Sequence, residues 1–503
     1  MADNSNSTLD ELKTSRLDRR LSIAKTSLQL GKRWAGNSVS GLFLNKEDRR
    51  TRNQAFMQEQ AKYLADELGK LKGSVVKIGQ MLALYGEHFL PPEITEALQS
   101  LNDNTATLSW TSMQKTLKAQ LGDLYAELEI DPVPIGTASL AQVHKAIIRE
   151  TGQLVVLKVQ YPGVADAIDS DLSLFKHLLR VTKAVPQTRI FDEWFAEIQD
   201  LLHQEVDYLA EAATTERFYD RLKDDNRYVV PQIIRRYSSE RLLCMTFEYG
   251  VSITDPSLRQ LSQSRRNALG QAAIEIMLQE IFVWGEMQTD PNFGNYLIRI
   301  NNRDSQSFVA DSNLDSSDLD NTKLNSATLD GTVIDNDSVT QVPTVSADSE
   351  VPDQVVLLDF GAIRQFDDHL LRIARGLLEA GFYHDFDAML ASMHGYEFLD
   401  TMSQSVREDM ARVFLTATEP FSLPELNPDI PPALVDSDGL YSWAESRLHQ
   451  RIMKEASSAM QSTEFSLPPK ELMFISRKFI GAYTFLTVLD AHTESRPLIA
   501  AVL

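Results

Sequence analysis

Apolar residues recur every three or four positions between residues 64 and 82. They are Leu64, Leu68, Leu71, Val75, Ile78 and Leu82. This spacing places apolar side chains on one face of an α-helix. Pro91 and Pro92 follow, and proline is tolerated in the first turn of a helix. The pattern therefore predicts helices over residues 51–100, with one face packed against the rest of the protein.

From Asp131 the pattern changes to short apolar runs between turn residues. A run through Val143, a turn at residues 150–152 and a second apolar run at 154–159 predict a β-hairpin. Lys158 lies within the second of these strands. A buried lysine needs an acidic partner, whereas a lysine on an edge strand can face solvent. Both interpretations of Lys158 stay open on the pattern alone.

A loop of small residues lies between the change of pattern and this hairpin. It consists of Gly136, Thr137, Ala138 and Ser139. In protein kinases a loop of this kind covers the nucleotide, and a lysine on a following strand contacts the phosphates. The order of loop and lysine is the same here, although the chain has neither a Walker A motif nor a GxGxxG motif. The segment is therefore a candidate nucleotide-binding hairpin.

Helical and strand-like patterns follow up to residue 285. The helical region 195–219 carries three acidic side chains among its apolar positions, Glu205, Asp207 and Glu211. The kinase template requires a helix glutamate that pairs with the strand lysine, whereas a solvated acidic face explains any one of the three. Residues 227–253 predict two strands that end at 246–250, where a kinase hinge would lie. Residues 271–285 predict an amphipathic helix with one apolar face, formed by Ile274, Met277, Leu278, Ile281 and Phe282.

Two strand-like runs, YLIRI and VVLLDF, flank a polar, acidic tract at residues 301–353. The tract contains ten Asp and one Glu against one Arg and one Lys, for a net charge of −9. A segment so poor in apolar residues cannot bury enough surface to fold alone, so we expect it to be disordered. When these 53 residues are removed, the 69-residue separation of Asp290 and Asp359 falls to 16 residues. The two runs are then expected to pair as a hairpin.

Three polar side chains lie at the ends of this predicted hairpin. Asn295 follows Asp290 after five positions, and Asp359 opens an Asp-Phe-Gly turn. In protein kinases the first aspartate is catalytic, and the asparagine and the later aspartate hold Mg²⁺. Taken singly, such residues are more often turn formers than catalytic groups. Their joint spacing favours a site for metal and phosphate.

Composition narrows the function classes. The chain has 43% hydrophobic residues and no run of about 18 apolar residues without charge, which predicts a soluble protein that does not span a membrane. Its one cysteine, Cys244, excludes an internal disulfide and is typical of a reducing compartment such as the cytoplasm. A net charge of −22 argues against non-specific binding of nucleic acid.

The first 36 residues have no apolar core of a secretory signal, and their acidic residues argue against a mitochondrial presequence. Their middle forms a basic amphipathic pattern, with Leu17, Leu21, Ala24 and Leu28 on one face. Such a helix would either lie on an anionic membrane surface, as a peripheral contact, or pack on the protein. The pattern does not distinguish these alternatives.

Taken in order, these motifs resemble those of the UbiB/aarF (ADCK-type) atypical kinases. The matching pieces are KIGQ at 77–80, PIGTASLAQVH at 134–144, VVLKVQYPGV at 155–164, EVDYLAEA at 205–212, TDPNFGN at 289–295 and LLDFGAIR at 357–364. PPKELMFISRKFIGAY at 468–483 resembles the C-terminal helices of the family. The loop reads Gly-Thr-Ala-Ser where the family often has three alanines. Gln288 and Thr289 stand where many members have a histidine.

The resemblance implies a role for each matching residue. Lys158 would contact the α- and β-phosphates of ATP or ADP and pair with Glu211, and residues 136–139 would cover the nucleotide. Asp290 would be the catalytic-loop aspartate, and Asn295 and Asp359 would hold Mg²⁺. A further group would lie over the site where a protein substrate binds in ordinary kinases, with Lys77 reaching Glu205 or Asp207. That group consists of Lys77, Gln80, Glu205 and Asp207.

The resemblance also implies the architecture: an α+β, two-lobed, protein-kinase-like fold. The expected parts are an amphipathic segment (1–50), a helical extension (51–130), a kinase-like N-lobe (131–250) and a C-lobe (251–503) with helices from about residue 367 and the acidic insert. The implied activity is Mg²⁺-dependent ATP hydrolysis or phosphoryl transfer that supports ubiquinone or isoprenoid-lipid metabolism, with a lipid or phenolic small molecule as partner. The alternatives are a protein kinase, which the KIGQ element disfavours, and a nucleotide-binding pseudokinase scaffold.

Overall fold

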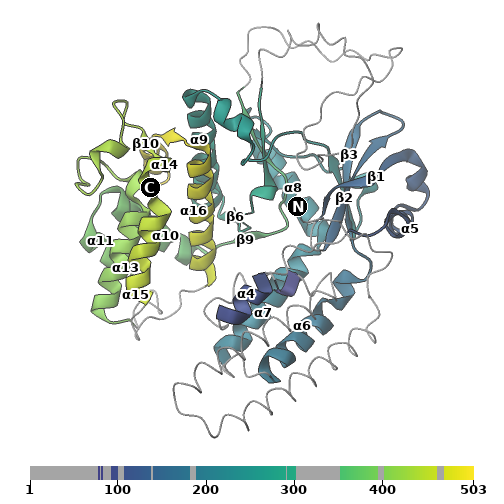
Figure 1. Ribbon diagram of the computed structural model, residues 1–503, viewed down its shortest axis with the longest axis horizontal. Coiled ribbons are helices and arrows are strands. Elements are labelled where there is room, and N and C mark those ends of the chain that lie inside the picture. Colours follow the sequence, from purple (N-terminus) through teal and green to yellow (C-terminus); the bar gives the residue numbers. More distant parts are fainter. Residues whose placement is uncertain are drawn as a thin grey trace, which may run out of the picture. The chain divides into compact units, whose positions relative to one another are not determined.

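The computed structural model in Figure 1 describes residues 77–79, 81–82, 92–99, 107–137, 140–181, 189–290, 292–301, 352–394, 402–460 and 470–503. These residues form two compact units. Unit 1 consists of the described residues up to Glu216 together with Pro231–Phe247, and unit 2 consists of Arg217–Val230 with the described residues from Glu248 onward. The expected amphipathic segment, and all of the acidic insert except its ends, lie outside the described residues. The domain limits given above remain predictions.

A four-stranded antiparallel sheet forms the centre of unit 1. Its order is β1-β2-β3-β5, and the strands are β1 (Leu128–Thr137), β2 (Ala141–Ile148), β3 (Leu154–Gln160) and β5 (Leu242–Thr246). The predicted hairpin of residues 141–160 is confirmed, and β1 begins three residues before the predicted change of pattern. Lys158 pairs with Val143 on one side and with Leu243 on the other. It therefore lies on an inner strand, which excludes the edge-strand interpretation.

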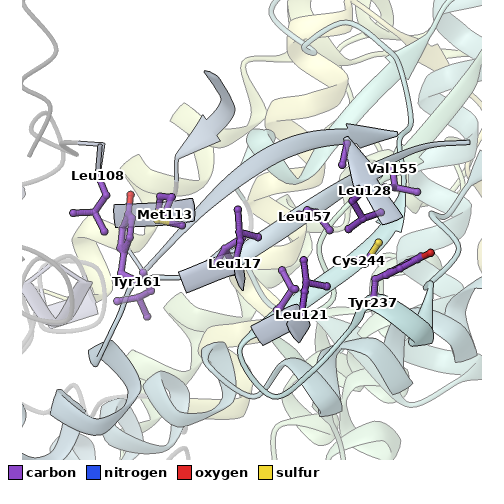
Figure 2. Packing of buried hydrophobic residues seen from close by; sticks show 14 of the residues in the cluster. Leu108, Met113, Leu117, Leu121, Leu128, Val155, Leu157, Tyr161, Tyr237 and Cys244 are labelled. Atoms are coloured by element: carbon purple, nitrogen blue, oxygen red, sulfur yellow. The ribbon is translucent and has the colours of Figure 1, made fainter. Parts of the chain in front are cut away.

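One face of this sheet packs against α5 (Trp110–Leu121). The α5 residues Met113, Leu117 and Leu121 repeat every four positions, so they share one side of the helix. On β3 the alternate residues Val155 and Leu157 point to the same face of the sheet. All of these side chains belong to one buried cluster, in which Figure 2 shows the α5 leucines beside the strand residues. Lys158 points to the opposite face by the same alternation.

Helices make up most of the remainder of unit 1. They are α4 (Pro92–Gln99), α6 (Val164–Val181), α7 (Arg189–Glu205) and the greater part of α8 (Tyr208–Leu222), with short 3₁₀ turns at Gly122–Glu127 and Arg235–Tyr237. The predicted helix start at Pro92 is confirmed. Helix α8 contributes its residues up to Glu216 to unit 1 and its last turn to unit 2. The described residues of the KIGQ region are also helical.

Unit 2 contains a three-stranded sheet of order β4-β8-β7. The strands are β4 (Tyr228–Val229), β7 (Tyr296–Arg299) and β8 (Gln354–Leu357). Strands β7 and β8 pair antiparallel across the insert, which confirms the predicted hairpin. The two strands observed within residues 227–253, β4 and β5, join different sheets, and the segment between them meets β5 in one antiparallel bridge, Ile233 with Met245. β4 joins β8 in parallel, whereas β5 lies in the sheet of unit 1.

The ends of the acidic insert meet at this hairpin. The backbone N–H of Asn301 donates to Asp353 Oδ1 at 2.9 Å, and Arg265 Nε donates to Asp353 Oδ2 at 2.7 Å. Arg265 is located in the first turn of α9 (Gln263–Leu278). The carboxylate of Asp353 therefore joins both ends of the insert to a helix of unit 2.

The helix predicted over residues 271–285 differs from the observed one. Helix α9 ends at Leu278 and continues as a π-helical turn over Gln279–Val283 (η5). Ile274 and Ile276 are both buried although they project about 200° apart. The five residues of the predicted apolar face are all buried, but α9 is not amphipathic as expected, because protein covers it on several sides.

Helices follow the sheet of unit 2, as predicted. They are α10 (Asp368–Phe382), α11 (Phe386–Ser392), α13 (Gln404–Ala417), α14 (Trp443–Ser446), α15 (Leu448–Met460), α16 (Lys470–Leu489) and α17 (Arg496–Ala500). Short strand pairs accompany them: β6 (Glu286–Gln288) with β9 (Ile363–Gln365), and β10 (Tyr441–Ser442) with β11 (His492–Thr493). In Figure 1, α13 and α15 run side by side. Among the described helices, none combines the length and the hydropathy needed to cross a membrane.

Candidate active site

A buried ion pair joins the strand lysine to α8 in unit 1. The Nζ atom of Lys158 lies 2.7 Å from Glu211 Oε1. The two side chains are 15% and 2% exposed, so solvent screens this pair little. The pairing of strand lysine and helix glutamate is the one expected from the sequence. It holds the ammonium over the inner strands of the sheet.

Two further residues of unit 1 position this pair. Lys158 Nζ lies 5.3 Å from the centroid of the Tyr208 ring, within the range of a cation–π interaction. Asp207 accepts a hydrogen bond from the backbone N–H of Ala210 at 3.0 Å, and its carbonyl accepts one from the Glu211 N–H. Asp207 therefore caps the start of α8, which is the helix that carries Glu211. Tyr208 was not anticipated from the sequence, although an aromatic residue beside the acidic cluster was a usable signal.

The KIGQ region contacts the end of α7. Lys77 Nζ lies 2.6 Å from Glu205 Oε1, with both side chains partly buried. The sequence left Glu205 and Asp207 as alternatives for this contact, and the structure places Lys77 on Glu205. Gln80 lies outside the described residues.

The small-residue loop begins at the end of β1. Gly136 and Thr137 are the last residues of that strand and pair with Val143 and Gln142. The register of β1 against β2 shifts on either side of Pro134, so the strand bends before the loop. Ala138 and Ser139 lie outside the described residues.

In unit 2 the catalytic-loop residues are joined by hydrogen bonds. Asn295 Nδ2 donates to Asp290 Oδ2 at 3.0 Å, and the backbone N–H of Asn292 donates to Asp290 Oδ1 at 3.2 Å. Because the Asn295 amide nitrogen is directed at Asp290, its amide oxygen points elsewhere and is available to a cation. Asn295 ends a 3₁₀ turn at Phe293–Asn295 directly before β7, and Asp290 lies three residues before that turn.

The third residue of this group is joined to it through the β7–β8 hairpin. The backbone N–H of Leu358 donates to the Asn295 carbonyl at 2.9 Å, which places Asp359 next to Asn295 across the hairpin. Asp359 Oδ1 accepts the Gly361 N–H at 2.8 Å. The structure thus brings Asp290, Asn295 and Asp359 together in unit 2.

The donor atoms of this group suit Mg²⁺. An amide oxygen and a carboxylate are hard oxygen ligands, and Mg²⁺ commonly takes only one or two protein carboxylates together with phosphates and water. Within the described part of the chain, no cluster of three or more His, Cys, Asp and Glu side chains could hold a metal. A site formed by one asparagine and one aspartate is consistent with a cation shared with a nucleotide.

Gln288 connects the catalytic and metal loops. Its side-chain Nε2 donates to the Asp359 carbonyl at 2.6 Å, and its Oε1 accepts the Asp290 N–H at 3.2 Å. Thr289 adds two bonds from its N–H and its hydroxyl to the Ala362 carbonyl. These two residues stand where many family members have a histidine, and their side chains bridge the two loops in this protein.

The predicted site residues divide between the two units. Unit 1 holds Lys77, Gly136, Thr137, Lys158, Glu205, Asp207 and Glu211, and unit 2 holds Asp290, Asn295 and Asp359. Within each unit the structure brings together the pairs that the motifs suggested.

The chain is similar to known atypical kinases. Residues 100–327 match the family model described as the ABC1 atypical kinase-like domain. The chain is 26% identical over 443 residues to the mitochondrial atypical kinase COQ8 of Saccharomyces cerevisiae, covering 86% of this chain and 74% of that protein. It is 24% identical over 444 residues to COQ8 of Schizosaccharomyces pombe, covering 88% of this chain but only 62% of the length of that relative.

A solved structure has a similar fold. It is the complex of Rv3197 with erythromycin from Mycobacterium tuberculosis, with a TM-score of 0.50 and 20% identity over 90% of this chain and 97% of that one. Together with the family match, this likeness confirms the α+β, kinase-like fold expected from the sequence. The match of residues 100–327 to the ABC1 atypical kinase-like domain, with the similarity to the COQ8 proteins, confirms the resemblance to the UbiB/aarF atypical kinases that the motifs indicated.

Proposed function

We propose that this protein binds ATP or ADP with Mg²⁺ and catalyses ATP hydrolysis or phosphoryl transfer to a small molecule. The observation that carries the proposal is the buried contact of Lys158 with Glu211 at 2.7 Å. Such a pair orients an ammonium that neutralises phosphate charge in kinases. The ABC1 domain match supports phosphotransferase or ATPase chemistry at the level of the family.

Each group of candidate residues has a distinct task under this proposal. Lys158 binds the α- and β-phosphates, and the loop from Gly136 to Ser139 covers the nucleotide. Asn295 and Asp359 hold Mg²⁺, which supplies charge neutralisation on the phosphates when it is bound. Asp290 orients the attacking oxygen of water or of a substrate hydroxyl. Catalysis then rests on positioning and electrostatics.

The KIGQ region favours ATP hydrolysis or small-molecule phosphorylation over protein phosphorylation. Lys77 is held by Glu205 at 2.6 Å, and Asp207 caps the helix that carries Glu211. Under the family resemblance this group, with Gln80, covers the place where an ordinary kinase binds a protein substrate. The contact of Lys77 with Glu205 supports a fixed position of the KIGQ region on the end of α7.

We extend the proposal to ubiquinone or isoprenoid-lipid metabolism at a membrane surface. The support is the similarity to proteins named COQ8, which are described as mitochondrial. The acceptor would be a phenolic or isoprenoid small molecule, and membrane contact would be peripheral. Vesicle binding tests this part independently of the chemistry.

The test is ATP hydrolysis by the purified full chain with Mg²⁺, with and without anionic-lipid vesicles and a phenolic ubiquinone-precursor mimic. Asp290→Asn removes a group that orients the nucleophile, so we expect turnover to fall by about 10²–10⁴-fold. Asp359→Asn should abolish the Mg²⁺ dependence. The matched control is Asp387→Asn, an exposed aspartate in the first turn of α11.

The outcomes separate the alternatives. Turnover that disappears in the Asp290 and Asp359 variants but not in the control supports the enzyme. Mg²⁺-dependent nucleotide binding without turnover indicates the pseudokinase scaffold instead. Phosphate transfer to a protein substrate at a rate above ATP hydrolysis would contradict the role assigned to the KIGQ region.

A further inference from the structure

A lysine and a glutamate form an ion pair inside unit 2. Lys478 Nζ, on α16, lies 2.6 Å from Glu280 Oε2, in the π-helical turn that follows α9. The side chains are 10% and 3% exposed. The two residues are far apart in the sequence, and neither has a part in the chemistry proposed above.

Stability alone does not explain this pair. Moving each ion out of water costs several kcal/mol, and apolar residues of similar size in place of a buried pair are often neutral or stabilising. Here each ion has a second partner. The Gln288 N–H donates to Glu280 Oε2 at 3.1 Å, and the Tyr296 hydroxyl is hydrogen-bonded to Lys478.

These additional partners oppose the effect of burial on Lys478. Burial lowers the pKa of Lys478, but Glu280 and Tyr296 outweigh burial, so its pKa lies above the ordinary value. Burial raises the pKa of Glu280, whereas Lys478 and the Gln288 N–H lower it. One carboxyl oxygen, Glu280 Oε2, therefore contacts both Lys478 Nζ and the Gln288 N–H.

The second partners lie on the two sides of the catalytic loop. Gln288 precedes Asp290 by two residues and bonds both the Asp290 N–H and the Asp359 carbonyl. Tyr296 directly follows Asn295 and pairs with Leu357 of β8. The ion pair thus holds the segment at both of its ends, and Asp290 and Asn295 lie between them.

We propose that Lys478 and Glu280 are positioning residues that fix the backbone of the loop from Gln288 to Tyr296. This inference rests on the proposed phosphoryl-transfer function. It assigns a task to α16, whose lysine acts on the site through Gln288 and Tyr296 without touching the reacting atoms. A misplacement of about 1 Å can cost about 10²-fold in rate, so loosening the loop should be visible in kcat.

The experiment compares Lys478→Met with the double variant Lys478→Met/Glu280→Leu and with Arg451→Met. Arg451, which is 34% exposed, forms an ion pair with buried Glu419 between α15 and a 3₁₀ turn, and Glu419 also accepts a hydrogen bond from the Tyr441 hydroxyl, outside the loop. All variants are studied in the full chain by thermal unfolding, by ATP turnover and by amide hydrogen exchange of residues 286–299.

We expect Lys478→Met to lower kcat by about 10–100-fold and to speed exchange at Gln288 and Asp290, with KM for ATP changed less than kcat. The double variant should regain thermal stability because no lone charge stays buried, but its kcat should remain low. Arg451→Met should lower the melting temperature without changing kcat or loop exchange.

Two results would overturn the positioning role. One is a double variant that recovers kcat together with stability, because the pair would then be structural only. The other is loop exchange in Lys478→Met that matches Arg451→Met. If the wild-type protein shows no turnover, the proposed function fails, whereas the exchange comparison still decides whether the pair holds the loop.

Discussion

At the residue scale, the burial of a charged side chain decides how much stability is lost when its partner is removed. Glu211 is 2% exposed at its side chain and faces Lys158, whereas Glu129 is 64% exposed and faces Arg149. Breaking a buried pair from one side leaves an uncompensated charge, which costs about 3–5 kcal/mol. An exposed pair contributes only about 0–1 kcal/mol.

We therefore expect Lys158→Met to lower the free energy of unfolding by about 3–5 kcal/mol, measured by urea denaturation. The control, Arg149→Met, should change it by less than about 1 kcal/mol. Similar losses in the two variants would show that the carboxylate of Glu211 is solvated. The nucleotide site would then lack the held lysine that the proposed function requires.

Cys244 gives a second prediction, on pH dependence. Burial raises the pKa of the Cys244 thiol from 9.0 to about 12, and burial likewise raises the pKa of Tyr161 from 10.0 to about 12. Both residues belong to the cluster in Figure 2. In the unfolded chain these groups ionise at lower pH than in the folded chain. Their contribution to stability is therefore complete below about pH 9 and is lost as the pH rises towards 12.

The burial that raises this pKa is tested by the reaction of Cys244 with a thiol reagent. Because a thiolate is the reactive form and Cys244 is the only cysteine, the native protein should be unreactive at pH 8, and labelling should follow global unfolding of unit 1 in urea. Rapid labelling without denaturant would contradict the burial of this side chain.

Among the site residues, those in short motifs could be predicted from the sequence. Asp290, Asn295 and Asp359 were anticipated because their spacing and strand context identify them. The pairing of Lys158 with Glu211 was anticipated from the family resemblance, because the pattern alone did not choose among the three acidic residues. The pair of Lys478 and Glu280 was not anticipated. Its only signal was a charged residue at the edge of an apolar run on each side, and tertiary packing alone decides which of many such residues become partners.

At the element scale, the β7–β8 hairpin is closed at the ends of the insert. Asn301 and Asp353 are hydrogen-bonded, and Arg265 fixes Asp353 to α9. The pairing of residues 296–299 with 354–357 does not draw on residues 302–351. The fold of unit 2 should therefore be independent of most of the insert.

We expect replacement of residues 302–351 by a four-residue glycine-serine turn to preserve folding and turnover. If the segment is as flexible as its composition predicts, the shorter loop lowers the entropic cost of closing the hairpin. The free energy of unfolding should then rise by about 2 kcal/mol. Thermal unfolding and ATP turnover measure the two effects. Combining the deletion with Arg265→Met provides the control, since it removes the link to α9. A deletion that prevents folding would show that the insert forms part of the core.

The sequence predicted where strands lie better than which strands pair with one another. Strands β2, β3, β7 and β8 were expected because each follows an alternating or apolar run. The parallel pairing of β4 with β8 was missed because β4 has only two residues and its partner lies 127 positions away. The π-helical turn at Gln279–Val283 was missed because periodicity does not distinguish it from a continuing helix.

At the scale of the whole molecule, the candidate residues are divided between two units. Unit 1 holds Lys158 and the small-residue loop, and unit 2 holds Asn295 and Asp359, for which phosphate and Mg²⁺ roles are proposed. A ligand that binds only the folded protein stabilises it by RT ln(1 + [L]/Kd), which is about 2.7 kcal/mol at 100 times Kd. Nucleotide binding should therefore be visible in thermal unfolding without any turnover.

We expect ATP to raise the melting temperature only in the presence of Mg²⁺. The double variant Asn295→Ala/Asp359→Asn should lose this shift, and Lys158→Met should lose most of it. The same titration with Asp387→Asn, on α11, should match wild type. A Mg²⁺-dependent shift that persists in the Asn295/Asp359 variant would move the cation site to other residues.

The junction of Asn301, Asp353 and Arg265 affects how the insert can change in evolution and how it can be engineered. When a loop begins and ends at a closed point, each doubling of its length costs only about 0.6 kcal/mol. The insert between Asn301 and Asp353 can therefore become longer or shorter, or change in composition, with little effect on folding. The same junction is a suitable place to insert a fluorescent or affinity module that reports on the protein without entering the core of unit 2.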